Sequence, residues 1–160
     1  MARQKRRRPL ASLSPKKPTA KVPRGTSFRM SRVRHWDTEP ELNVRRLVRK
    51  LGFHFQSHVG RLPGRPDIVI PEHGVVIRVH GCFWHGHSCR RGRLPATNRS
   101  FWRKKIERNR LRDRQTGLQL RRLGWKVLTV WECQVKDLTV QKLARRLRRP
   151  ERRPTSRSKR

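Results

Sequence analysis

Hydrophobic residues recur along the chain with two different periods, which predict both helices and strands. In "DTEPELNVRRLVRKLG" the apolar positions follow the i, i+3, i+4, i+7 pattern of one helix face, which predicts a helix over residues 37–52. Thr38 and Glu41 form the T-x-x-E signature of a capping box at its start. Gly52 can end the helix in a left-handed conformation.

Three strands are predicted next. "FHFQSHV" (53–59) alternates apolar and polar residues, whereas "DIVI" (67–70) and "VVIRVH" (75–80) are apolar and β-branched. The residues "PEHG" between the last two strands are typical of a tight turn.

The second half of the chain predicts a long helix, a strand and a last helix. A polar helix is expected over residues 98–123, with a ragged apolar stripe made by Trp102, Ile106, Leu111, Leu118 and Leu120. "WKVLTVW" (125–131) is a strong strand candidate, and the last helix is expected to begin at an Asp137 cap. The order α-β-β-β-α-β-α predicts an α/β fold, in which a mixed sheet is flanked by helices.

The charge of the chain indicates a polyanionic partner. Its 160 residues include 44 lysines and arginines against 10 carboxylates, a formal net charge of +34. Nucleic acid is the expected partner, because each neutralised phosphate releases a counterion. The alternatives are a merely solvated surface or a ribosomal protein. No run of residues approaches membrane-spanning length, so no membrane role is expected.

Composition divides the chain into three parts. Residues 1–29 contain ten basic residues, no acidic ones and four prolines, which predicts a disordered basic extension. Residues 30–144 form the predicted folded domain, and residues 145–160 a basic C-terminal tail. The three cysteines, together with the absence of a signal-peptide pattern, indicate a reducing intracellular compartment.

A cluster of metal-ligand residues follows the strand at 75–80. Cys82, His87 and Cys89 form C-x4-H-x-C, and Cys133 comes just after the strand at 125–131. A Cys3His set is a common structural zinc shell, which would tie the loop at 82–94 to the end of that strand. The alternative is that the cysteines are free and buried as small hydrophobic residues.

Four further residues are candidates for catalysis. Asp67 begins a strand and could hold Mg²⁺ beside a phosphate, although a lone aspartate next to proline is more often a turn residue. Glu41 could complete the helix cap or face the metal through water, and the sequence does not separate the two roles. His80 and His85 are not needed for a four-ligand zinc shell; either could act as a general acid or base, or serve in packing.

Phe83 and Trp84 lie inside the cysteine–histidine stretch. Large apolar rings in such a loop could be wedges inserted between DNA base steps. The alternative is that they cap the sheet, and the pattern alone slightly favours that structural role.

Several stretches together resemble the very-short-patch repair (Vsr) mismatch endonucleases of bacteria. The matching stretches are "TEPELNVRRLVRKLGF", "LPGRPDIVI", "VIRVHGCFWHGHSC", "LPATNRSFWRKKIERNRLRD" and "LGWKVLTVWEC". "HGCFWH" followed by H-x-C is highly specific, and the order of the others agrees. The resemblance implies a restriction-endonuclease-like core, a variant of the PD-(D/E)xK architecture, with one structural zinc site.

The resemblance also implies roles for the candidate residues. Mg²⁺ would bind Asp67 and the carbonyl of Val79, His85 would be the catalytic histidine, and His80 and Glu41 would support the metal–water network. The zinc ligands would be Cys82, His87, Cys89 and Cys133. The DNA-binding residues would be Met30, Phe83, Trp84, Lys105 and Asn109.

The implied activity is Mg²⁺-dependent nicking of duplex DNA 5′ to the thymine of a T:G mismatch. A cytoplasmic, nucleoid-associated bacterial enzyme is expected, acting as a monomer and followed by downstream repair proteins. Two alternatives remain open. One is a related sequence-specific nicking or homing nuclease, and the other is a catalytically silent, zinc-stabilised DNA-binding protein.

Overall fold

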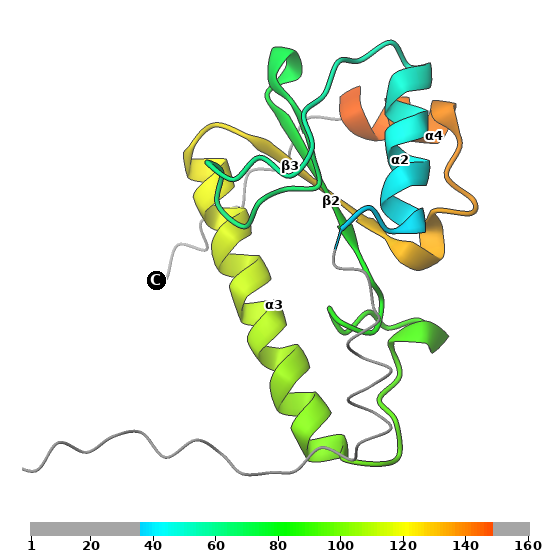
Figure 1. Cartoon of the computed structure of the whole chain (residues 1–160), viewed down its shortest axis with the longest axis vertical. Coiled ribbons are helices and arrows are strands. Elements are labelled where there is room, and N and C mark those ends of the chain that lie inside the picture. The colour runs from blue at the N-terminus through cyan, green and yellow to red at the C-terminus, as the bar shows by residue number, and fades with distance from the viewer. Residues whose placement is uncertain (1–35, 149–160) are drawn as a thin grey trace, which may run out of the picture. The chain divides into compact units, whose positions relative to one another are not determined.

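The computed structural model describes residues 36–148, which form a mixed α/β unit (Figure 1). The elements in chain order are α2 (Glu39–Lys50), β1 (Ile68–Ile70), β2 (Val75–His80), α3 (Arg99–Arg122), β3 (Lys126–Trp131) and α4 (Val140–Arg148). Short 3-10 turns cover Pro71–His73, Arg90–Gly92 and Glu132–Gln134. No helix within this range is long and apolar enough to cross a membrane. The predicted extension (1–29) and Met30 lie outside the described residues.

The sheet has the strand order β1-β2-β3 and is mixed, as predicted. Strands β1 and β2 are antiparallel with Ile68 opposite Ile77, while β2 and β3 are parallel with Ile77 opposite Leu128. A parallel pair needs a long crossover connection. The segment that contains α3 provides it, so the carboxyl ends of β2 and β3 meet at one edge.

The strand predicted over residues 53–59 is wrong. That segment makes a single bridge, in which Gln56 and Val69 exchange backbone hydrogen bonds of 2.8 Å. His58 has a φ of 51°, in the left-handed region, which ends the extended conformation two residues later. The alternating pattern arises because Phe53 and Phe55 pack against the core without belonging to a strand.

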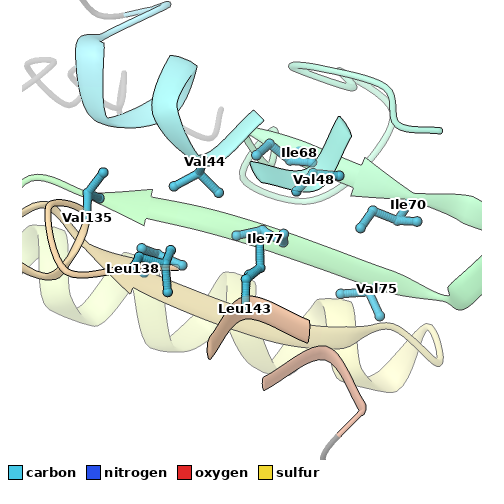
Figure 2. Packing of buried hydrophobic residues seen from close by; sticks show 10 residues of the cluster. Val44, Val48, Ile68, Ile70, Val75, Ile77, Val135, Leu138 and Leu143 are labelled. Atoms are coloured by element: carbon cyan, nitrogen blue, oxygen red, sulfur yellow. The ribbon is translucent and has the colours of Figure 1, made fainter. Parts of the chain in front are cut away.

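Side chains of the strands alternate between two cores. Ile68, Ile70, Val75 and Ile77 face α2 and α4, where Val44, Val48 and Leu143 cover them (Figure 2). On the other face, Val69 and Val76 pack against Leu120 of α3. Completely burying an Ile or Leu side chain contributes about 1.5–3 kcal/mol, so both faces stabilise the sheet.

The helix ends follow the predicted signals in part. Gly52 and Gly124 follow the C-cap residues of α2 and α3, and their φ angles of 80° and 83° are those of left-handed residues that stop a helix. The predicted Asp137 cap of the last helix is wrong. The Lys142 N–H donates to Thr139 Oγ1 (3.2 Å) and α4 begins at Val140, because the hydroxyl of Thr139 can satisfy a free N–H of the first turn. Helix α4 continues to Arg148, so it includes the first residues of the predicted basic tail.

The apolar stripe predicted on α3 is correct for three of its five residues. Trp102, Ile106 and Leu120 are buried, whereas Leu111 and Leu118 are 56% and 52% exposed. The residue that faces the sheet next to Leu118 is Gly117, which is buried. Because neighbouring helix positions are about 100° apart, a helix that turns Gly117 inward must turn Leu118 outward.

Candidate functional site

The predicted site residues gather at the carboxyl end of β2 and in the loop that follows it. Strand β2 ends at His80, and the loop with the cysteines and the aromatic pair continues from there. Strand β3, which is parallel, ends at the same edge of the sheet at Trp131 and is followed by Cys133. This edge is where parallel strands usually place ligand-binding residues.

Asp67 lies immediately before β1 and faces the end of β2. The backbone N–H of Val79 donates a 2.7 Å hydrogen bond to Asp67 Oδ2. Burial raises the pKa of Asp67 to about 6; the Val79 bond opposes that rise, and Glu41 adds to it. A nearby cation would stabilise the charged form of a carboxylate that is desolvated in this way. Since the N–H and C=O of one residue in a strand point to the same edge, the Val79 carbonyl faces this side too.

Glu41 combines a capping role with a position near Asp67. Its Oε2 accepts the N–H of Asp37 (3.0 Å), and its Oε1 accepts the hydroxyl of Thr38 (2.8 Å). The predicted capping box is therefore rearranged, because the hydroxyl of Thr38 bonds the glutamate and not a helix N–H. Glu41 is only 5% exposed and raises the pKa of Asp67, so it also shapes the electrostatics of the site.

A buried arginine that the sequence did not reveal lies beside this carboxylate. Arg45 contacts Asp37 Oδ1 (2.5 Å), Glu41 Oε2 (3.4 Å) and His58 Nε2 (2.8 Å). Arg45 and His58 also lower the pKa of Asp37, mainly through their hydrogen bonds. The one sequence signal for this network was the i, i+4 spacing of Glu41 and Arg45.

His80, His85 and Asp113 form a second polar cluster at the end of β2. The rings of the two histidines stack with centroids 3.9 Å apart, and His85 Nδ1 lies 2.6 Å from Asp113 Oδ2. Burial, followed by the nearby His85 and Arg78, lowers the pKa of His80 to about 3, so this ring is neutral at physiological pH. Burial raises the pKa of Asp113, but the hydrogen bond and charge of His85 outweigh it and the net pKa is lowered.

Asp113 is a candidate functional residue that the sequence analysis missed. A histidine whose Nδ1 is held by a carboxylate has a defined tautomer and orientation, as a general base requires. A usable signal was present, since Lys105, Asn109 and Asp113 follow one another at i, i+4, i+8 on one face of α3.

The four predicted zinc ligands come together. One ligand atom from each of Cys82, His87, Cys89 and Cys133 lies within 4.8 Å of all the others. Burial raises the pKa of Cys82 to about 12, while a hydrogen bond with His87 lowers that of Cys89 to about 6. Three sulfurs and one imidazole nitrogen are the donor set of a tetrahedral structural zinc site.

Neighbouring contacts hold the loop in the shape that the cluster needs. Glu132 accepts the N–H of Cys82 (3.2 Å) and pairs with Arg91 (3.2 Å). A Cβ on Gly92 would lie 1.9 Å from the carbonyl oxygen of His87, so only glycine fits there. Glu132 thus links the loop to the segment that follows β3.

Phe83 and Trp84 form an aromatic group with Trp102 of α3. Ring centroids are 5.2 Å apart for Phe83–Trp84 and 5.1 Å for Phe83–Trp102. Trp102 is 5% exposed, whereas Phe83 and Trp84 are half-buried. The pair therefore rests on a buried platform and keeps part of its surface in solvent.

The two predicted base-reading residues contact the same loop. Lys105 Nζ lies 5.3 Å from the Trp84 ring centroid, and Asn109 Nδ2 donates to the Trp84 carbonyl (2.9 Å). Both side chains thus support the aromatic loop from one face of α3.

A buried carboxylate that contacts β2 and a histidine–aspartate pair at the end of that strand, on a strongly basic chain, are features typical of a DNA-cleaving hydrolase. Comparison with known proteins gives the family. The family model "DNA mismatch endonuclease Vsr" matches residues 21–91. The type II nicking enzyme V.XorIIP of Xanthomonas oryzae pv. oryzae is 46% identical over 116 residues, covering 72% of this chain and 85% of that protein.

Two further relatives agree. The type II nicking enzyme V.NmeAIP of Neisseria meningitidis is 40% identical over 114 residues, covering 71% of this chain and 81% of the relative. The DNA mismatch endonuclease Vsr of Escherichia coli is 44% identical over 114 residues, covering 69% of this chain and 73% of the relative. The chain belongs to the Vsr family of DNA mismatch endonucleases and nicking enzymes, and its mixed sheet flanked by helices is consistent with that fold.

Proposed function

We propose that this chain is a Mg²⁺-dependent endonuclease that nicks duplex DNA 5′ to the thymine of a T:G mismatch. The observation that carries the proposal is the His85–Asp113 pair. The ring of His85 stacks on His80, the last residue of β2, and the residue before it, Val79, contacts Asp67. This arrangement puts a candidate base and a candidate metal ligand on one edge of the sheet.

Asp67 and the Val79 carbonyl would hold the Mg²⁺. Carboxylate and carbonyl oxygens are the ligands this ion prefers, and the raised pKa of Asp67 indicates a carboxylate that lacks compensating positive charge. When bound, Mg²⁺ supplies charge stabilisation to the phosphate and the leaving oxygen. Glu41, held by its cap contacts close to Asp67, would order water around the ion.

His85 would take the proton from the attacking water. Because the Asp113 carboxylate only accepts hydrogen bonds, His85 Nδ1 carries the hydrogen in this pair and Nε2 is left to accept a proton. The negative charge of Asp113 then stabilises the imidazolium that forms. The neutral His80 ring, stacked on His85, would fix the ring plane without adding a competing charge.

Zinc on Cys82, His87, Cys89 and Cys133 would be structural. These four side chains would fill a tetrahedral zinc shell, which would leave no open position for water or substrate. The ion would join the loop that displays the aromatic pair to the segment after β3.

Mismatch selectivity would come from Phe83 and Trp84 entering the base stack. A wedge costs less to insert at a mispair, because less pairing and stacking is lost. Lys105 and Asn109, directly behind the Trp84 loop, would reach the exposed bases, and Met30 would enter from the other groove.

A nicking assay with matched duplexes tests the proposal. The full chain, loaded with zinc, is incubated with otherwise identical duplexes containing T:G, C:G or T:A at one position, in Mg²⁺ or EDTA. We expect a nick only in the thymine strand of the T:G duplex and only with Mg²⁺. Equal nicking of paired duplexes would instead support the sequence-specific nicking enzyme, which the names of the relatives V.XorIIP and V.NmeAIP keep open.

A further inference from the structure

Arg78 is a half-buried arginine of β2 to which the chemistry above gives no role. Its Nη1 donates to the backbone carbonyl of Asp113 (3.0 Å) and to Thr116 Oγ1 (3.1 Å). Within residues 36–148, its buried Nε has no hydrogen-bond partner. Burying a guanidinium with an unpaired N–H costs stability, and an apolar residue of similar size would avoid that cost.

The partners of Arg78 belong to one turn of α3, residues 113–117, which we call the middle turn. The two elements on which the site depends both approach this turn. From one side comes Arg78, two residues before His80 and on the same face of β2. From the other side comes Gly64 in the loop before Asp67, where an added Cβ would lie 3.1 Å from the Thr116 side chain.

Gly117 permits this close packing. A Cβ there would lie 3.2 Å from Arg121 Nη1 and 3.6 Å from Arg78 Nη2. The glycine is buried, although glycine in a helix interior costs about 1 kcal/mol relative to alanine. Two unfavourable residues therefore meet where β2 contacts α3: the half-buried Arg78 on the strand and the helical Gly117 in the middle turn.

We propose that Arg78 is a positioning residue for the His85–Asp113 pair, an inference that rests on the proposed role of that pair. The bond from Arg78 ends on the carbonyl of the same residue whose carboxylate holds His85. It fixes the middle turn relative to β2, and β2 also carries His80, on which the His85 ring stacks. Arg78 thus sets the separation between Asp113 and His85 without touching the DNA or the reacting water.

A double-mutant cycle distinguishes this role from a general stabilising one. Single-turnover nicking of the T:G duplex is measured for the zinc-loaded full chain and for the variants Arg78→Met, Asp113→Asn and the two combined. We expect Arg78→Met to slow nicking about 10–100-fold, the range for residues that orient a functional group. If Arg78 acts through Asp113, the double variant should be no slower than Asp113→Asn alone, because residues that act as a unit are not additive.

Arg146 provides a matched control. It is also a half-buried arginine that donates to a backbone carbonyl, that of Thr129, but it belongs to α4 on the other face of the sheet. Arg146→Met should lower the melting temperature and leave the single-turnover rate unchanged. Duplex binding and zinc content should be normal in both arginine variants.

Each outcome has a separate meaning. If the double variant loses the product of the two single effects, or if Arg78→Met nicks normally, the positioning role is overturned while the base assignment stands. If Asp113→Asn nicks normally, the proposed role of the pair fails first. Should Arg78→Met not fold, Arg78→Lys and Thr116→Val replace it in the same cycle. Lysine keeps a donor for the Asp113 carbonyl and should retain more activity than Thr116→Val combined with Arg78→Lys.

Discussion

The backbone N–H of Val79 donates a 2.7 Å hydrogen bond to Asp67 Oδ2, yet the pKa of this carboxyl is raised to about 6. The bond satisfies one oxygen and ties the start of β1 to the end of β2. It does not compensate for the burial of the negative charge, and the nearby charge of Glu41 disfavours the ionised carboxylate further. Asp67 is thus held in position at a cost in stability that a bound cation would remove.

The first prediction is that Asp67→Asn stabilises the metal-free chain while abolishing nicking. Between pH 3.8 and about 6 the unfolded chain releases this proton and the folded chain keeps it, so the stability of the wild type falls as the pH rises through that window. At pH 7.5 without Mg²⁺ the variant should be more stable by roughly 1–3 kcal/mol. The difference in the free energy of unfolding between the variant and the wild type should be smaller at pH 5, as measured by denaturant unfolding.

Mg²⁺ should reverse the order of stability of Asp67→Asn and the wild type, since the ion stabilises only a chain that can bind it. Adding the ion should raise the melting temperature of the wild type and leave that of Asp67→Asn unchanged. Asp137→Asn, a change at an exposed aspartate, is the control and should alter neither stability nor nicking. If Asp67→Asn still nicks, Asp67 does not belong to the metal site.

The second prediction concerns the cysteine–histidine cluster. Cys133→Ser removes the ligand that connects the loop to the segment after β3, so zinc should be lost, the chain should melt early, and DNA binding and nicking should fail together. Metal content by mass spectrometry, melting, gel shift and a nicking assay measure the four effects. Asp67→Asn should keep one zinc per chain. A stably folded, active Cys133→Ser chain without zinc would contradict the structural role.

Local patterns predicted most of the fold, and the exceptions have physical causes. Strand β1 and the first half of β2 were recognisable because they are buried on both faces and read as continuous apolar runs, whereas β3 was recognisable from its β-branched and aromatic residues. The false strand at 53–59 had the right alternation, but its phenylalanines pack on the core while His58 turns the backbone. Alternation reports which side chains are buried and does not require a partner strand.

The site was predictable where residue type alone indicates chemistry. The cysteines, the paired rings and the lone Asp67 stood out because they are rare in this chain. Asp113 and Arg45 did not, since charged residues on a helix are ordinary and their helical spacing to other candidates is a weak signal until the tertiary packing shows that they point inward. Arg78 is the same case, an arginine in a basic chain whose burial no local pattern reveals.

The third prediction separates the aromatic wedge from folding. Trp84→Ala should reduce nicking of the T:G duplex far more than it reduces binding of a paired duplex at low salt. Phe101→Ala is the matched control, because this ring is 37% exposed and belongs to the same aromatic group through Trp102. It should affect both substrates little and equally. Parallel losses on both substrates for Trp84→Ala would mark Trp84 as a folding residue.

The fourth prediction is that residues 1–29 add affinity and not selectivity. They carry ten of the 44 basic residues and no acidic ones, which suits contact with phosphates. Deleting them should reduce the slope of log K against log salt, while the preference for T:G over C:G stays nearly intact. Binding titrations at several salt concentrations give both quantities. A preference that collapses with the deletion would place mismatch recognition in the extension.

The last prediction concerns the buried Arg45. Replacing it with leucine leaves Glu41, only 5% exposed, without its arginine partner, and removes the guanidinium that Asp37 and His58 both contact. Removing one partner of a buried ion pair typically destabilises a protein by about 3 kcal/mol. Arg45 also lowers the pKa of Asp67, so its loss should disfavour the charged carboxylate and weaken activation by Mg²⁺.

Arg46→Leu is the matched control, since Arg46 is the next residue of α2, is exposed and bonds only Asn43 among the described contacts. It should change the free energy of unfolding by less than about 0.5 kcal/mol. Denaturant unfolding of the two variants, with the Mg²⁺ concentration for half-maximal nicking, distinguishes the two effects of Arg45. If Arg45→Leu is as stable as Arg46→Leu, the network around Glu41 contributes nothing to the fold. If its Mg²⁺ requirement is also unchanged, the network does not influence Asp67 either.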